Sequence, residues 1–309
     1  MKQRLLIILL ALAAVACTKH GENAYVGLNI GYEVNGEALV TDTLCYTNEA
    51  GNLFLITEIQ WFLSDIQLLD EEGEWHTLRH REALDSIAEL TEHIFYIDTD
   101  IPESQVLHGK KIPTGHYTAL RFTFGLDETD NETGLFSDPP ESDMFWPEML
   151  GGGYHYMKLN GKYAGGEGRL KPLAIHLGIG QNEDLTQFYQ NYFIVEFPID
   201  FDVVTNAENQ LDLTMVIDNW FRHPNTIDFN ETGSHIMQNQ AAQRLLNGNG
   251  NDVFRIGKPA ENKNDMDKEK KEQFADKLKD VMRKGTPQPH FWSWENTKKR
   301  IQRIQDMKI

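Results

Sequence analysis

The chain has 309 residues, of which 40% are hydrophobic, 10% aromatic and 25% charged, and this ordinary globular composition excludes a disordered, collagen-like or polytopic membrane protein. It holds 29 Lys and Arg against 47 Asp and Glu, and the formal net charge of −18 is the wrong sign for binding nucleic acid through its phosphates. Two cysteines, Cys17 and Cys45, are too few for a disulfide framework or a thiolate-rich metal cluster.

Residues 1–16 have the features of a cleaved secretory signal. Lys2 and Arg4 precede an apolar run at 5–15 that is too short for a mature transmembrane helix, which needs about 20 residues. The small residues before Cys17 resemble the lipobox of bacterial lipoproteins. We therefore expect an acylated Cys17 that anchors the protein to a membrane of the cell envelope, in the periplasm or at the outer membrane. The alternative is secretion with an unmodified Cys17.

Charge divides the remaining chain near residue 258. Residues 17–257 hold 13 Lys and Arg against 38 Asp and Glu, a net charge of −25, whereas residues 258–309 hold 14 against 9, a net charge of +5. An acidic surface attracts cations or a basic partner, and it also serves solubility alone. We expect one folded domain at 17–257 and a basic helical extension at 258–309.

Alternation of apolar and polar residues predicts β-strands through most of the domain. Leu28, Ile30, Tyr32 and Val34 alternate with small or polar residues. Similar runs occupy 53–70, 74–79, 120–126, 154–163, 173–179, 192–199 and 211–217. Many short strands and few helical patterns favour a mainly β fold, an antiparallel β-sandwich with long loops plus C-terminal helices.

The segment 127–153 is rich in Asp, Glu, Gly and Pro and has no periodicity, which predicts a long loop of functional importance. Its acidic start, 127–132, lacks the EF-hand pattern, and we expect a solvated surface rather than a calcium site. Helical signals come late. Ser234 is the expected cap of one helix, and the apolar spacing across 274–282 predicts an amphipathic helix in the extension.

Common enzyme signatures are absent from the sequence. It contains no HExxH, GxSxG or CxxC motif and no phosphate-binding glycine loop followed by Lys and Ser or Thr. Carboxylates are plentiful, but nothing in the sequence selects a catalytic pair from the 47 available. We therefore expect a protein that is not an enzyme, and a hydrolase with an unidentified carboxylate pair has the least support.

Two histidines on predicted neighbouring strands form the candidate metal site. His155 is expected to share a strand face with Met157, and His176 lies on the face opposite to Ile175 and Leu177. Two imidazoles with a polarisable group nearby would suit copper better than a hard cation. The plainer interpretation is a pair of surface or hydrogen-bonded histidines.

The order of several short motifs resembles a known family. IQWFLSDIQLL, GHYTALRFTFGL, a Met-Phe-Trp loop before GGGYHYMKLNG, and a strand with His-Leu-Gly follow one another in the chain. This succession, over roughly residues 25 to 257, is similar to the MbnP-like copper-binding family, relatives of the methanobactin-cassette MbnP proteins and of the MopE/CorA copper proteins.

The resemblance implies a secreted, mainly β protein that binds copper through histidines. In some members the site is assisted by a tryptophan that a di-haem protein related to cytochrome c peroxidases oxidises to kynurenine. Carried over by motif, His176 becomes a metal ligand and Trp146 the candidate for oxidation, and His155 is added from its place in the Gly-Tyr-His-Tyr strand.

The sequence departs from the family pattern at three places. Asn131-Glu132 stands where relatives often have Asn-His, Trp146 is the single remaining residue of a Trp-x-Trp pair, and no Cys follows Gly178. Thioethers could replace missing ligands, although methionines more often serve packing. The methionines in question are Met144, Met149 and Met157.

A second hypothesis comes from a different class of protein. Trp146, Tyr154 and Tyr156 could form a stacking platform on which a surface lipoprotein captures a glycan or a peptide.

Overall fold

The computed structural model describes residues 22–81, 90–165, 169–182, 184, 186–233 and 235–259. The predicted signal at 1–16, Cys17 and the predicted helices of the extension lie outside these residues. Among the described helices, none combines the length and the apolar character needed to cross a membrane.

The first sheet is built around a long N-terminal strand, β1 (Asn23–Val34). In order across the sheet lie β15 (Phe254–Ile256), β14 (Asn209–Val216), β1 and β2 (Glu37–Ala38), and β7 (Val106–Pro113) also pairs with β1. The pairing of β1 with β14 is parallel, with Leu28 opposite Leu211, whereas the other pairings are antiparallel. Most of the domain lies between β1 and β14 in the sequence, so their pairing brings its two ends together.

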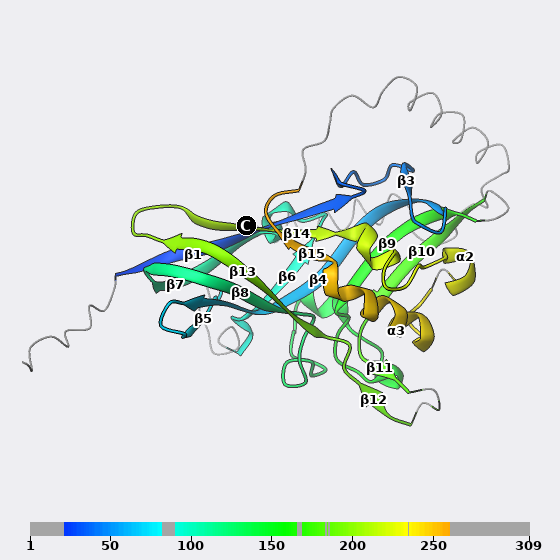
Figure 1. The fold of residues 1–309 in the computed structure, drawn as a ribbon. Coiled ribbons are helices and arrows are strands. Elements are labelled where there is room, and N and C mark those ends of the chain that lie inside the picture. The colour runs from blue at the N-terminus through cyan, green and yellow to red at the C-terminus, as the bar shows by residue number, and fades with distance from the viewer. Residues whose placement is uncertain are drawn as a thin grey trace, which may run out of the picture.

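The second sheet is antiparallel and centres on β4 (Leu53–Asp70), which has 18 residues. Its order is β10 (Leu170–Leu177), β9 (Met157–Ala164), β4, β8 (Gly115–Phe124) and β13 (Phe193–Val203). Shorter strands also pair with β4, namely β3 (Tyr46–Thr47), β5 (Trp75–Thr77) and β6 (Ile94–Asp98). The layered strands are shown in Figure 1.

The core lies between the two sheets and is rich in aromatic rings. Trp61 of β4 lies 5.4 Å from Phe254 of β15, measured between ring centroids, and 6.1 Å from Phe124 of β8. Its indole N–H donates a hydrogen bond of 2.9 Å to the Tyr32 hydroxyl of β1. Burial of each such ring contributes about 1.5–3 kcal/mol, and the contacts of Trp61 with Phe254 and Tyr32 cross the sandwich and hold its two layers together.

The remaining elements are short. A two-stranded ribbon is formed by β11 (Gly180–Gln181) and β12 (Phe188–Tyr189). The helices are α2 (Phe229–Thr232), α3 (Gln240–Asn249) and the 3₁₀ turns η1 (Pro102–Gln105), η2 (Glu141–Met144), η3 (Glu148–Leu150), η4 (Ile217–Phe221) and η5 (Gly250–Asp252).

The mainly β sandwich predicted from the sequence is confirmed, and two of its elements begin later than expected. The last helix of the domain, α3, begins after Asn239, whose side-chain oxygen accepts the Ala242 N–H, and not after Ser234. The strand β9 begins at Met157 rather than at Tyr154. Asparagine is as good an N-cap as serine, because its side-chain oxygen accepts a backbone N–H of the first turn in the same way.

The long loop predicted at 127–153 contains no strand between β8 and β9, apart from an isolated bridge of Phe145 with Tyr154, and folds back onto the β9–β10 edge. Asn131 anchors it there, because its side-chain oxygen accepts the Tyr154 N–H while its amide nitrogen donates to the Tyr156 hydroxyl. Thr133 adds a hydrogen bond from the Gly153 N–H to its hydroxyl oxygen. The loop is therefore ordered by side-chain bonds, and it places His155 at the end of the sheet.

We predict that Tyr32→Phe destabilises the domain by about 1–3 kcal/mol, because the buried Trp61 N–H loses its acceptor. Urea unfolding followed by circular dichroism measures the change. Tyr25→Phe is the matched control, since Tyr25 is 43% exposed on the same strand. Equal stability of both variants would contradict the assigned role of the bond.

Candidate metal site

His155 presents one ring nitrogen with no partner. Its Nδ1 donates to the Met144 carbonyl oxygen at 2.9 Å, and its backbone N–H donates to the same oxygen at 2.6 Å. The other nitrogen, Nε2, is buried and makes no hydrogen bond in the described part of the chain. Because Nδ1 carries the proton, Nε2 holds a lone pair, which is the state of a histidine ready to bind a metal.

The prediction that His155 shares a face with Met157 is wrong. The chain bends at Tyr156, whose N–H bonds to the Leu177 carbonyl, and regular pairing begins only at Met157. Met157 enters the main core, whereas the ring of His155 lies against the ring of His176. The alternation rule applies to regular strands, so the bend moved His155 to the opposite face.

His176 is the second nitrogen donor. The His155 and His176 ring centroids are 5.2 Å apart and the ring planes meet at 82°. The Nε2 of His176 lies 2.9 Å from the side-chain oxygen of Asn160, whose amide nitrogen faces Glu58 at 3.4 Å. This arrangement assigns the proton to Nε2 and the lone pair to Nδ1 of His176.

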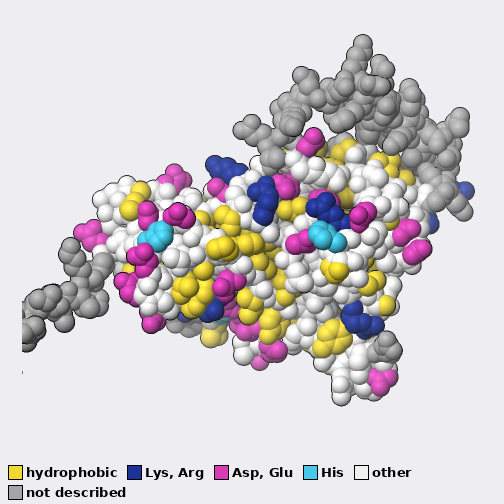
Figure 2. All heavy atoms as spheres, in the orientation of Figure 1, with side chains coloured by type: hydrophobic (Ala, Val, Ile, Leu, Met, Phe, Trp, Pro, Cys, Tyr) yellow, Lys and Arg dark blue, Asp and Glu magenta, His cyan; other side chains and the backbone are white. Residues whose placement is uncertain are grey.

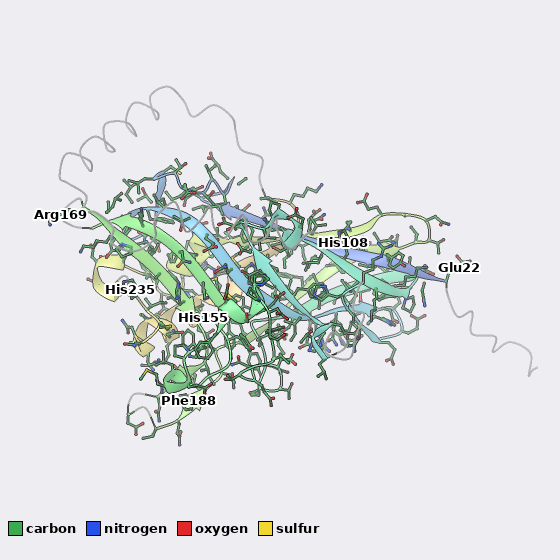
Figure 3. All side chains as sticks on the ribbon, turned by 180° about the vertical axis from the view of Figure 1, so that it is seen from behind. Glu22, His108, His155, Arg169, Phe188 and His235 are labelled. Carbon is green, nitrogen blue, oxygen red and sulfur yellow. The ribbon has the colours of Figure 1, made fainter. Side chains whose placement is uncertain are left out.

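Trp146 completes the cluster from the loop. Its ring centroid is 4.7 Å from that of His155, its N–H donates to the Leu150 carbonyl at 3.0 Å, and its side chain is fully buried. Gly178 is required for this packing, because a Cβ there would lie 2.6 Å from the indole ring. The structure thus brings together the three residues singled out in the sequence as metal ligands and as the oxidation candidate. Figure 3 shows His155 at the Phe188 end of the β9–β10 pair, away from Arg169.

Both imidazoles are neutral at physiological pH. Burial, with the Lys158 charge as the next cause, lowers the pKa of His155 to about 2. The same two causes, followed by the charge of His235, lower the pKa of His176 to about 4. Neutral imidazole is the form that binds metals, so a metal would not have to displace a proton from either ring.

Several residues at this site were not singled out in the sequence. Lys158 is the cross-strand neighbour of His176, and the backbone of His235 pairs in parallel with Ala174 of β10. Lys158 and Asn160 could have been found by alternation along β9, since they share a face with each other. The approach of His235 could not have been found in this way, because it depends on how a segment some sixty residues further along the chain packs against β10.

The methionines expected as substitute ligands lie elsewhere or point outward. Met144 and Met157 are fully buried in the main core, so they serve packing. Met149 is 76% exposed on η3. Asn131, which stands where relatives often show Asn-His, has a structural role in anchoring the loop.

The aromatic platform of the second hypothesis is contradicted by burial. Trp146 and Tyr156 are fully buried and Tyr154 is 2% exposed, so their rings cannot stack on a glycan or a peptide. These side chains pack inside the loop and the sandwich, where Tyr154 contacts Phe62 and Phe136.

Two further groups of acidic side chains, one of them with a histidine, could hold a cation. They are Asp65, His93 and Asp130, and Glu58, Asp98 and Asp100. Asp130 belongs to the acidic stretch expected to be solvated, yet its carboxylate bonds to His93 at 2.8 Å. A cavity of about 690 Å³ is lined in part by His80, Glu92 and His108. Neither His155 nor His176 lines it.

Comparison with known proteins agrees with this fold. The family model named MbnP matches residues 23–238. A solved structure, MbnP from Methylosinus trichosporium, has a TM-score of 0.52 and 13% sequence identity, and the match covers 76% of this chain and 99% of that chain. At this identity the likeness concerns the fold alone. No curated protein matches the chain.

We predict that the two depressed pKa values make the domain lose stability in acid. Unfolded histidine titrates near pH 6.5, above the folded values of about 4 and 2, so each contribution is complete above pH 6.5 and is lost as the pH falls toward the folded pKa. Between its folded and its unfolded pKa, each histidine lowers the free energy of unfolding by about 1.4 kcal/mol for each pH unit of acidification. Urea unfolding between pH 7.5 and 4.5 measures it.

The comparison is made with the His176→Gln variant, so that the carboxylates common to both proteins cancel. Its stability should fall less steeply between pH 6.5 and 4.5 than that of the unmodified domain. Parallel curves would show that His176 titrates normally in the folded protein.

Proposed function

The chain belongs to the MbnP family, and from that premise we propose that it is a cell-envelope protein that binds copper and handles or stores it, without turning over a substrate. The family is associated with copper binding. The observation that carries the proposal for this chain is the buried, unpartnered Nε2 of His155 beside His176.

The donor set fits copper better than a hard cation. Both donors are neutral imidazoles, and no carboxylate is grouped with them among the described residues. Calcium and magnesium prefer oxygen ligands, whereas copper stands highest among the divalent first-row metals for nitrogen ligands. The Met144 carbonyl and Asn160 each bond to the far nitrogen of a ring, so both rings are held in the orientation that binding needs.

Copper is the cargo of the site in this proposal, and the chain's own residues orient and shield it. Burial of His155 and Trp146 keeps water away from Nε2 of His155. The acidic domain adds a long-range attraction for cations, and Figure 2 shows acidic side chains spread over one face of the molecule.

The location in the cell envelope rests on the sequence. The signal at 1–16 and the lipidation of Cys17 would tether the acidic domain to a membrane.

The copper proposal predicts that His155→Ala and His176→Ala each lower copper affinity by about tenfold or more, since each variant removes one of two nitrogen donors. Competition with a chromophoric Cu(I) chelator measures the affinity, and circular dichroism checks the fold. His116→Ala is the control, because His116 lies on β8 and pairs with Asp202. Unchanged affinity in His176→Ala would reject the assigned ligand.

We also propose that a di-haem partner related to cytochrome c peroxidases oxidises Trp146 to kynurenine. The contact of the indole with His155 supports this, because a modified side chain there would border the metal. The intact mass of protein from its native envelope tests it. Addition of two oxygen atoms followed by loss of CO, mapped to Trp146, is the expected result, and an unmodified mass from copper-replete cells would contradict the proposal.

A further inference from the structure

Lys158 places a positive charge beside the two imidazoles. It lies directly opposite His176 in the antiparallel pairing of β9 with β10. Cross-strand neighbours of this kind have Cβ atoms about 4.5–5.5 Å apart. The side chains of Lys158, Asn160 and His176 therefore share one face of the sheet.

The ammonium group is fixed on the loop side of the site. Its Nζ donates to the Asp143 carbonyl oxygen at 2.5 Å. Asp143 directly precedes Met144, whose carbonyl oxygen orients His155. One end of the lysine is therefore held by the strand that faces His176, and the other by the loop that orients His155.

The charge acts on both donors. The side chain of Lys158 shares the face of the sheet with His176, and its ammonium is bonded to the residue that precedes Met144, whose carbonyl oxygen orients His155. A positive charge beside two neutral nitrogen donors opposes the binding of any cation there.

This repulsion depends on the charge of the bound ion. By Coulomb's law, a fixed positive charge opposes a divalent ion twice as strongly, in free energy, as a monovalent ion at the same place. The imidazoles supply no negative charge to offset it. The two donors bind through nitrogen alone, so the charge near them decides between ions of similar ligand preference.

We propose that Lys158 is the specificity-determining residue of the His155–His176 site and selects monovalent copper over Cu(II) and Zn(II). This inference rests on the proposed copper function. Lys158 touches no metal in this account; it acts through its charge.

The test compares Lys158→Met, which removes the charge and keeps much of the side-chain volume, with Lys162→Met. Lys162 lies four residues further along β9, on the same face and opposite Pro172, about 13 Å away along the strand. The full chain is titrated with Cu(II) and Zn(II) alone and with Cu(I) in competition with a chelator. The reduction potential of bound copper is measured in parallel.

Lys158→Met is expected to raise affinity for Cu(II) and Zn(II) on the order of tenfold to a hundredfold, and affinity for Cu(I) by about the square root of that factor. The reduction potential falls by about 59 mV for each tenfold change in the Cu(II) to Cu(I) affinity ratio. Lys162→Met leaves the ratio unchanged. Lys158→Arg keeps the charge and retains the selectivity of the unmodified protein, which separates charge from packing.

Equal changes in Cu(I) and Cu(II) affinity in Lys158→Met, or none, would overturn the inference while the copper function stands. Loss of selectivity in Lys158→Arg would also overturn it, since the charge would be present without its effect. Failure of the unmodified protein to bind copper in any of these titrations would overturn both the proposed function and this inference.

Discussion

The backbone carbonyl oxygen of Met144 holds His155 in place in the candidate site. The Met144 carbonyl accepts both the backbone N–H and the Nδ1–H of His155, so it fixes the position of the chain and the tautomer of the ring together. A buried imidazole that donates from Nδ1 must leave Nε2 with a lone pair. Such a buried nitrogen without a partner costs stability, and it is left open to a ligand. The rest of the site depends on this carbonyl.

The loop that carries Met144 is rigid for reasons that lie in its own side chains. Asn131 and Thr133 bond to the segment 153–156, and the Trp146 N–H of the backbone donates to the Gly153 carbonyl at 2.8 Å. Gly153 has a φ of 76°, a left-handed conformation that favours glycine, and the Asn131 side chain lies where its Cβ would be. A preformed site binds without the cost of ordering a loop.

Charge acts on two scales in this protein. Residues 17–257 have a net charge of −25, and such a charge favours the approach of cations from a distance, which affects the rate of encounter more than the choice of ion. At the site Lys158, the cross-strand neighbour of His176, carries a charge of the opposite sign. Attraction at long range and selection at short range can therefore be separated in one molecule.

The sequence by itself determined the strands and the residue types of the site. Alternation identified β1, β4 and β14, because a half-buried strand must place every second side chain in the core. It missed β6 and β7, which lack a clear apolar alternation, and it gave no sign that β1 and β14 pair in parallel, since that contact joins the two ends of the domain.

Only the tertiary structure decided which atoms face each other at the site. The motifs named His155, His176 and Trp146, but the bend at Tyr156 moved His155 to the face of His176, and burial closed the aromatic rings to solvent. Local sequence encodes the period of a strand, whereas a bend, a tautomer and the field of a lysine depend on hydrogen bonds and neighbours that come from distant parts of the chain.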